Sequence, residues 1–358
     1  MTIVNLGILA HVDAGKTSLT ERLLHAAGVI DEVGSVDAGS TQTDTLELER
    51  RRGITIRAAV VSFAIGDVTV NLIDTPGHPD FIAEVERSLG VLDGVVLVVS
   101  AVEGVQAQTR VLMRALRRLR IPTLLFINKI DRRGADPDRV LADIARRLTP
   151  DIVAMGAVRD ASYRPFGPSD SAFTDRLVDL LTEHDDALLA DCVNHPPGYA
   201  RLRAELAAQT ARGLVHPVFA GSAVTGAGVE TLMSGIAELL PPATADGPLR
   251  GTVFKVERGP AGEKIAYVRM FAGTVRVRDR LRCPTAARRR SPRCRWWAPG
   301  RATASPRARS PRCAAWPASA SATPSVRPAT CHRSSRRRAW RPSSCRAGRR
   351  TWARCTPR

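Results

Sequence analysis

One stretch decides the fold: Ala10-His11-Val12-Asp13-Ala14-Gly15-Lys16-Thr17, which follows an apolar run and opens a helical pattern. It fits the phosphate-binding loop G-x-x-x-x-G-K-[ST], except for alanine at the first position. Small residues let backbone N–H groups curl around a β-phosphate, and the helix N-terminus adds a favourable field. Lys16 would reach the β- and γ-phosphates, and the Thr17 hydroxyl would ligate Mg²⁺. The alternative, a turn with a solvated lysine, fits the strand-to-helix context less well.

Apolar runs and helical patterns alternate outward from this loop. The runs are rich in β-branched residues and leucine, which is typical of strands buried on both faces; they lie at residues 3–12, 68–73, 95–99 and 123–127. The helical patterns lie at residues 17–27, 79–89, 106–119 and 137–148. Strand, helix and strand at this spacing predict an α/β domain, with a mostly parallel sheet and flanking helices on both sides.

A second motif, Asp74-Thr75-Pro76-Gly77-His78, ends the apolar run 68–73. A carboxylate at this place can hold Mg²⁺ through water. The Gly77 N–H can contact a γ-phosphate, and glycine permits the backbone flip that senses this phosphate. His78 would then lie beside the terminal phosphate and orient an attacking water. The alternative is a turn histidine without a role.

A third motif, Asn128-Lys129-Ile130-Asp131, follows another apolar run. The Asp131 carboxylate would accept two hydrogen bonds from the N1–H and N2–H₂ edge of guanine, whereas adenine would leave this charge unpaired. Asn128 would brace the loop and contact the base, and the Lys129 stem could cover the ring. Gly221-Ser222-Ala223, after the run 218–220, could donate a backbone N–H to guanine O6.

The four motifs together carry more weight than any one of them. They occur in the order that a nucleotide site needs, each at the C-terminal end of an expected strand, where open α/β sheets bind ligands. This coincidence predicts a guanine-nucleotide-binding domain that takes GTP or GDP with Mg²⁺. The residues expected at the nucleotide are Ala10, His11, Val12, Asp13, Ala14, Gly15, Lys16, Thr17, Ser18, Asp74, Thr75, Pro76, Gly77, Asn128, Lys129, Ile130, Asp131, Ser222 and Ala223.

The motifs also resemble a known family. The loop 10–17, the stretch Arg52-Gly53-Ile54-Thr55-Ile56 and the motif 74–78 are similar to the translational GTPases of the elongation factor G branch. Within that branch, residues 5–12, 34–44 and 104–110 are more similar to the ribosomal-protection tetracycline-resistance GTPases than to elongation factor G. The resemblance covers about residues 1–282.

This resemblance implies a P-loop GTPase domain followed by a translation-factor β-barrel, and hydrolysis of GTP on the ribosome. It makes Thr55 a switch threonine that ligates Mg²⁺ together with Thr17 and Asp74. It makes His78 the catalytic residue, which places the hydrolytic water once the ribosome docks. Asp13 would help to hold a monovalent ion or an rRNA contact. No arginine finger stands at a motif position, so slow intrinsic hydrolysis is expected, accelerated by ribosomal RNA and proteins.

We expect three parts and a linker along the chain, with an insertion inside the first part. The GTP-binding domain would occupy residues 1–240, with an inserted subdomain at about 132–215, and a linker rich in proline would occupy 241–250. An incomplete antiparallel β-barrel would occupy 251–282, since residues 252–257, 265–271 and 274–278 alternate with period two. Three strands do not close a barrel and leave an open apolar edge.

The tail, residues 283–358, carries the basic character of the chain. It holds twenty arginines and no Lys, Asp or Glu. Subtracting these arginines from the 53 basic residues of the chain leaves 33 basic residues against 35 acidic ones in residues 1–282. The net charge of +18 therefore belongs to the tail. One valine is its only aliphatic residue larger than alanine, too little to offset chain entropy. We interpret the tail as disordered, out-of-frame translation that begins near residues 281–290. The alternative is a basic RNA-binding arm, in which arginines neutralise phosphates and five tryptophans stack on bases.

The composition of the 358 residues limits the possible locations. No run of 18 apolar residues occurs, and the first residues lack the pattern of a secretory signal, so neither a membrane span nor export is expected. Seven cysteines do not suggest disulfides. We expect a cytoplasmic monomer with GTP and the ribosome as partners and no membrane.

Three functions stay open at this point. The first is a ribosomal-protection GTPase, of which this chain would be a truncated and non-protective version. The second is an elongation factor G-like translocation GTPase. The third is a non-enzymatic fragment that binds GTP or RNA.

Overall fold

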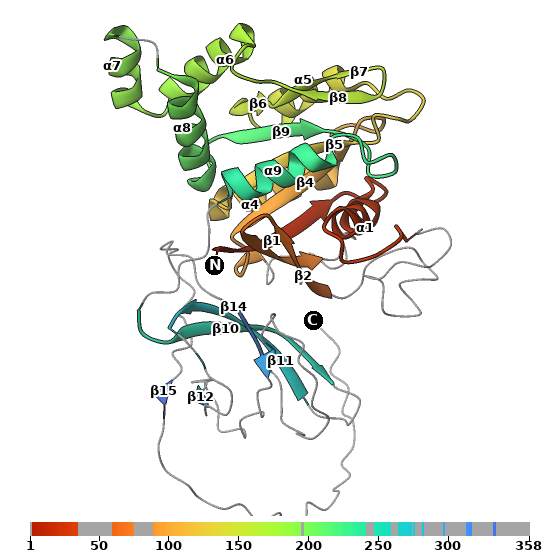
Figure 1. The fold of residues 1–358 in the computed structure, drawn as a ribbon, viewed down its shortest axis with the longest axis vertical. Helices are drawn as coiled ribbons and strands as arrows, with labels where there is room; N and C mark the ends of the chain where they lie inside the picture. Colours follow the sequence, from red (N-terminus) through yellow and green to blue (C-terminus); the bar gives the residue numbers. More distant parts are fainter. Residues whose placement is uncertain are drawn as a thin grey trace, which may run out of the picture.

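The computed structural model describes residues 2–34, 59–74, 89–194, 197–240, 247–258, 264–273, 275, 281–282, 296–297, 313–316 and 332–333 (Figure 1). A seven-stranded sheet forms the first domain, in the order β2-β3-β1-β4-β5-β9-β6. Its strands are β1 (Thr2–Ala10), β2 (Ala59–Ile65), β3 (Val68–Asp74), β4 (Gly94–Ser100), β5 (Thr123–Asn128), β6 (Ile152–Ala154) and β9 (His216–Ala220). All neighbours pair in parallel except β2 and β3. The predicted α/β class is therefore confirmed.

Both faces of the sheet are buried, which explains the continuous apolar runs. Every residue of β4 and β5 is buried. Val96 and Val98 face one core cluster, whereas Val95, Leu97 and Val99 face the other. A strand that must be apolar on both sides loses the alternation of a half-exposed strand.

Helices cover the two faces. The first core cluster packs the sheet against α1 (Lys16–Ala26) and α9 (Val229–Leu239), and the second against α4 (Ala107–Leu119) and α5 (Pro137–Arg147). Pro137 opens α5, and the Asp136 carboxylate accepts the Arg139 N–H at 2.9 Å, which caps this helix. Of the helices that the structure describes, none combines the length and apolarity that a membrane span requires.

The predicted elements differ from the observed ones at several places. The strand predicted at 3–12 ends at Ala10, because the chain turns there into the loop. Strand β2 was not predicted; it forms a hairpin with β3 across Gly66-Asp67, and Gly66 takes the left-handed φ of +54° that such a turn needs. Residues 79–88 of the helix predicted at 79–89, and all of the strand predicted at 274–278 except residue 275, lie outside the described residues.

The stretch 132–215, expected as an inserted subdomain, contains parts of the main domain. Helix α5 packs in the second core cluster, and β6 forms an edge of the main sheet beside β9. The rest of the stretch is the hairpin of β7 (Gly156–Arg159) and β8 (Ser162–Pro165), followed by α6 (Ser171–Thr182), α7 (Asp186–Asn194) and α8 (Tyr199–Ala211). Buried residues of these three helices, among them Leu177, Leu188 and Leu206, belong to the first core cluster. Figure 1 shows these three helices (green) at the end of the molecule away from β10 and β11 (teal). The bounds of the inserted subdomain therefore stay a prediction.

The second domain is built on an antiparallel pair, β10 (Arg250–Arg258) and β11 (Lys264–Ala272). Within the tail, expected to be disordered, the structure describes β13 (Trp296–Trp297), β14 (Cys313–Trp316) and β15 (His332–Arg333). Strand β14 pairs with the open edge of β11, and β15 pairs with β12 (Leu281–Arg282). An unpaired edge accepts backbone groups from any sequence, so this pairing needs no apolar side chains.

A buried ion pair joins the second domain to the first. Arg269 of β11 donates from Nη2 to Asp93 Oδ1 at 2.5 Å, and both side chains are almost fully buried. The other oxygen of Asp93 accepts from Asn5 N at 2.9 Å and Asn5 Nδ2 at 2.6 Å. Asn71 of β3 donates to Asn5 Oδ1 at 3.0 Å. Burial lowers the pKa of Arg269, and the Asp93 carboxylate opposes that shift. The carboxylate thus holds groups of β1 and β11 directly, and Asn5 extends the network to β3.

Candidate functional site

The loop between β1 and α1, expected to hold phosphates, is a tight turn fixed by backbone hydrogen bonds. His11 O accepts the Ala14 N–H at 3.2 Å, and Gly15 O accepts the Leu19 N–H at 3.0 Å. Gly15 has a φ of +91°, and a Cβ there would lie 2.3 Å from Asn128 Nδ2, so only glycine fits. Asp13 is exposed and takes a φ of +64°, a conformation that is rare outside glycine.

The first turn of α1 provides the groups expected at the phosphates. Lys16 is buried, and Thr17 and Ser18 are half-buried. Gly15 at the N-cap contributes no side chain, and this turn holds no acidic residue. Its N–H groups and the positive end of the helix dipole are therefore well placed for an anion.

Asn128 connects two of the predicted loops. Its side chain is buried; Nδ2 donates to Ala14 O at 2.9 Å, and Oδ1 accepts the Ala223 N–H at 2.9 Å. One amide thus ties the loop after β1 to the loop after β9. These two hydrogen bonds are those that the bracing role predicted for Asn128 requires.

The loop after β9 is fixed from several sides. Ile127 O accepts the Gly221 N–H at 2.9 Å, and Gly221 O accepts the Ile130 N–H at 3.3 Å. The buried Ser222 hydroxyl accepts from Val224 N at 3.2 Å and Thr225 N at 3.1 Å.

Arg22 of α1 also anchors this loop. Its Nε donates to Ala223 O at 2.8 Å, and its Nη2 donates to Val224 O. Arg22 was not predicted as a site residue, because a polar residue on a helix gives no signal of a partner 201 positions away.

The loop after β5 carries the expected base-reading residues. Lys129 takes a left-handed φ of +68°, and its Nζ lies 3.3 Å from Glu103 Oε1. Lys129 and Asp131 are half-buried. Asn128 and Ile130 are hydrogen-bonded to the neighbouring loops, so the segment directly before Asp131 is held in place.

Helix α4 supports the phosphate loop from behind. His11 Nδ1 lies 3.1 Å from Thr109 Oγ1, and Val12 N donates to Gln108 Oε1 at 3.3 Å. Burial lowers the pKa of His11, and the carboxylate of Glu103 opposes this shift, so a neutral imidazole is favoured. Gln108 and Thr109 were not predicted as site residues. Their position in the stretch 104–110, which resembles the family, is the signal that could have identified them.

Several predicted residues cannot be placed. Asp74 ends β3, and its backbone lies opposite Ile8 of β1, close to the start of the phosphate loop. Its side chain lies outside the described part of the structure, as do Thr55, Thr75, Pro76, Gly77 and His78. The structure therefore brings together the predicted loops after β1, β5 and β9 and leaves the Mg²⁺ ligands Thr55 and Asp74 and the catalytic residue as expectations.

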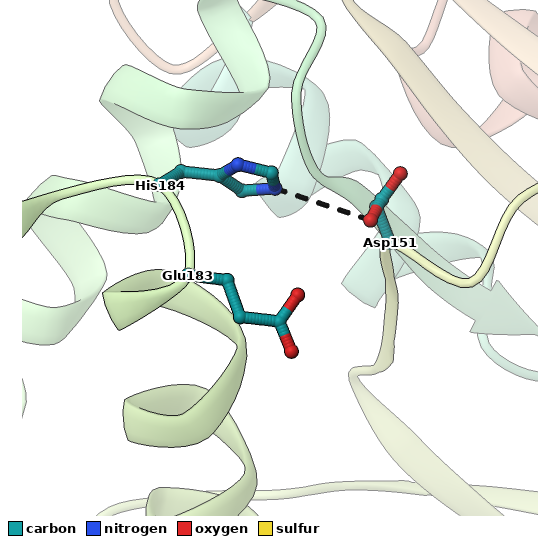
Figure 2. Close-up of side chains that lie close together, drawn as sticks. All are labelled: Asp151, Glu183 and His184. Atoms are coloured by element: carbon teal, nitrogen blue, oxygen red, sulfur yellow. Dashed lines mark ion pairs between the residues drawn. The ribbon is translucent and has the colours of Figure 1, made fainter.

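A second group of possible metal ligands lies elsewhere. Asp151, Glu183 and His184 bring their donor atoms within 4.8 Å of one another (Figure 2). His184 Nε2 lies 3.9 Å from Asp151 Oδ1, and the other Asp151 oxygen accepts from Thr149 at 2.7 Å. Asp151 precedes β6, at the sheet edge opposite the nucleotide loops. The contact between His184 and Asp151, with Glu183 as the chain neighbour of His184, accounts for this grouping.

Comparison with known proteins shows one consistent set of matches. Residues 1–242 match the model of the elongation factor Tu GTP binding domain. The chain is 63% identical over 289 residues to the oxytetracycline resistance protein of Streptomyces rimosus, covering 78% of this chain and 44% of that protein. It is 53% identical over 290 residues to the tetracycline resistance protein TetM of Streptomyces lividans, covering 78% and 45%.

A solved structure agrees with these matches. A crystal structure of a protein from Thermus thermophilus superposes with a TM-score of 0.71 at 26% identity, covering 79% of this chain and 47% of that one. The chain thus spans less than half the length of the relatives that it matches.

Proposed function

Since the chain belongs to the family of elongation factor Tu GTP-binding domains, we propose that it binds and hydrolyses GTP on the ribosome as a GTPase of the tetracycline ribosomal-protection type. One observation carries the nucleotide site: the buried Asn128 amide links the phosphate loop at Ala14 to the loop at Ala223. The 63% identity to an oxytetracycline resistance protein supports the ribosomal-protection type. Ribosomal RNA and proteins are the partners proposed, and the cytoplasm is the proposed location.

The base would be read by the two loops that Asn128 holds. The Asp131 carboxylate would accept from guanine N1–H and N2–H₂, and the Ala223 region would approach O6. The Lys129 stem would cover one face of the ring. An adenine base has no donor pair for Asp131, so a buried charge would be left unpaired.

The phosphates would lie over the first turn of α1. Lys16 and N–H groups of the loop and of the first turn of α1 would hold them. Thr17, Thr55 and Asp74 would supply the hard oxygens that Mg²⁺ prefers. The pairing of β1 with β3, which places the backbone of Asp74 opposite Ile8, supports the part proposed for Asp74. When bound, Mg²⁺ neutralises charge that develops on the transferred phosphoryl group. His78 would orient the attacking water.

Domain boundaries and the tail belong to the same proposal. The two resistance proteins match 78% of the chain, and residues 283–358 make up about a fifth of it. This agreement supports a family-like region at about 1–282 and a tail that arises from a shifted reading frame. Translating the underlying DNA in the other two frames tests it: a frame that continues the barrel supports the shift, and its absence in both rejects it.

A mutation at His78 tests the activity. GTP hydrolysis by the chain should rise when ribosomes are added, and His78→Ala should lower the stimulated rate by about 100-fold or more, because the water loses its orienting group. GDP binding should not change, which separates catalysis from folding. A variant that keeps the stimulated rate would contradict the assignment.

The elongation factor G-like alternative predicts the same hydrolysis. A growth assay under tetracycline, with the reading frame restored, separates it: a ribosomal-protection protein should raise the tolerated dose, and a translocation factor should not. The non-enzymatic alternative predicts RNA binding that weakens steeply with salt, without ribosome-stimulated turnover.

A further inference from the structure

We propose that Glu103 is a positioning residue of the nucleotide site: its carboxylate holds the Lys129 ammonium, and this fixes the lysine stem where the guanine ring is to lie. The inference rests on the proposed function and adds to it a residue outside the four motifs. It makes the affinity for guanine nucleotides depend on a charge in the loop after β4.

The contact between the two residues is direct. Lys129 Nζ lies 3.3 Å from Glu103 Oε1, and the Lys129 side chain is 22% exposed. Lys129 takes a φ of +68°, and its carbonyl accepts the Arg132 N–H at 3.2 Å. A left-handed lysine persists only where its surroundings fix it. With this backbone conformation, the ammonium of Lys129 reaches Glu103, whereas the side chain of Asn128 binds the loops after β1 and β9.

Glu103 itself lies in a loop built to hold it. Ser100 Oγ accepts from Val102 N at 3.2 Å and from Glu103 N at 3.3 Å. Gln106 Nε2 donates to the Glu103 carbonyl at 2.8 Å. Gly104 completes the turn with a φ of +68° and donates to Ser100 O at 2.9 Å. The carboxylate therefore projects from a backbone of defined shape.

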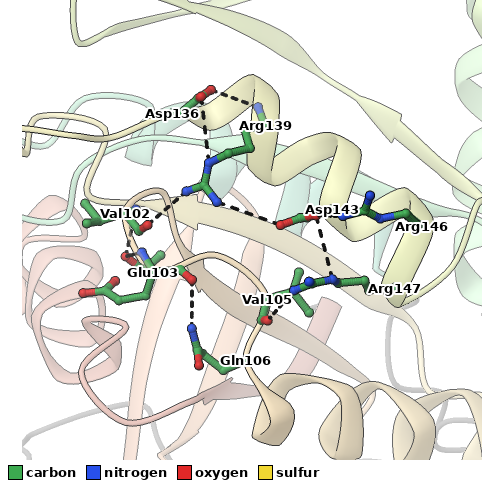
Figure 3. A network of polar contacts seen from close by, with 10 residues as sticks. Val102, Glu103, Val105, Gln106, Asp136, Arg139, Asp143, Arg146 and Arg147 are labelled. Carbon is green, nitrogen blue, oxygen red and sulfur yellow. Dashed lines mark hydrogen bonds and ion pairs between the residues drawn. The ribbon is translucent and has the colours of Figure 1, made fainter.

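Helix α5 supports the same loop. Arg139 Nη2 donates to the Val102 carbonyl at 3.0 Å, and Arg147 Nη1 donates to the Val105 carbonyl at 3.4 Å (Figure 3). Asp143 lies between these arginines, at 4.0 Å from Arg139 Nη1 and 3.8 Å from Arg147 Nε. Two arginines thus hold the carbonyls on both sides of Glu103.

The charge state of Glu103 suits this role. Burial tends to raise the pKa of Glu103, but hydrogen bonds from Ser100 and its own backbone N–H, together with the Lys129 ammonium, lower it to below its usual value. The group is ionised at neutral pH, so the pair is charged. A pair this exposed contributes little to folding stability. We therefore expect the pair between Glu103 and Lys129 to change the affinity for the nucleotide and to leave the free energy of unfolding nearly unchanged.

The test compares GDP affinity among variants of the full chain. Glu103→Gln should bind GDP about threefold to tenfold more weakly, since the freed lysine must be immobilised when the nucleotide binds. The GDP affinity of Glu103→Asp should lie between that of the wild type and that of Glu103→Gln. The control Asp191→Asn removes the exposed pair between Arg201 and Asp191, far along the chain from the nucleotide loops, and should leave the affinity unchanged. The loss should shrink at high salt, as expected for a charge effect.

A second pair of variants, made in a chain that carries Lys129→Met, tests whether Glu103 acts through the Lys129 ammonium. Lys129→Met retains the stem and removes the ammonium, so Glu103→Gln should cause no further loss in it. The inference is overturned if Glu103→Gln binds GDP as tightly as the wild type, or if it weakens binding equally in the Lys129→Met background. A folded wild type that binds no GDP would instead refute the proposed function.

Discussion

Replacing Asp131 with asparagine is expected to weaken GDP binding about a hundredfold and to make xanthosine diphosphate the preferred ligand. In the proposed site, the carboxylate would offer two acceptors to the N1–H and N2–H₂ of guanine. An asparagine amide offers one acceptor, and its NH₂ faces the guanine amino group, donor against donor. Hydrogen bonds to charged groups contribute about 1.5–3 kcal/mol, which sets the size of the loss. Xanthine carries a carbonyl oxygen in place of that amino group and accepts from the new amide.

The structure indicates that this substitution changes a functional group and not the loop. Asn128 and Ile130 are held by hydrogen bonds to Ala14, Ala223 and Gly221. Titrations with GDP and xanthosine diphosphate measure the effect, and Asp175→Asn on the exposed side of α6 is the control. If Asp131→Asn kept the GDP preference of the wild type, Asp131 would not read the base.

The second large effect is expected at the junction of the two domains. Asp93→Ala should lower the free energy of unfolding by about 3–5 kcal/mol, because it leaves the Arg269 guanidinium buried without its partner. Within the described part of the chain, Arg269 Nε and Nη1 already have no hydrogen-bond partner. Asn5 N and Nδ2 would lose their acceptor as well.

Denaturant unfolding measures this loss, and a double variant separates its causes. Asp93→Leu combined with Arg269→Met replaces the ion pair by apolar groups, so a large part of the stability should return. The Asn5 donors would still lack an acceptor, so full recovery is not expected. An Asp93→Ala chain within about 1 kcal/mol of the wild type would mean that water reaches this pair.

Much of the first domain could be predicted because its strands are buried on both faces and end at motifs. The run 123–127 is a threonine followed by four apolar residues, and the observed strand adds only Asn128. Strand β6 was missed, since three residues are too short to show a period. Strand β2 was also missed, although the Gly66-Asp67 turn between two apolar runs indicates a hairpin.

The supporting residues of the site could not be predicted for a different reason. Arg22, Gln108 and Glu103 are polar residues on helices or loops, where a solvated position is the ordinary expectation. Their contacts with Ala223, Val12 and Lys129 span 201, 96 and 26 positions. Only the folded sheet brings these segments together.

The junction shows the same limit. In β11, Val268, Met270 and Ala272 are buried, so the alternation of the strand would place Arg269 on the opposite, open face of this sheet. Arg269 is nevertheless almost fully buried, since Asp93 of the first domain lies against it. The pattern of a strand predicts which residues share a face, and it does not predict what covers that face.

The most direct measurement is a titration of the purified chain with GDP and with ADP in the presence of Mg²⁺. We expect GDP to bind at least about a hundredfold more tightly than ADP, since Asp131 finds its two donors only on guanine. Equal binding of the two nucleotides by the folded chain, or binding of neither, would contradict the guanine site that we propose for the loops after β1, β5 and β9.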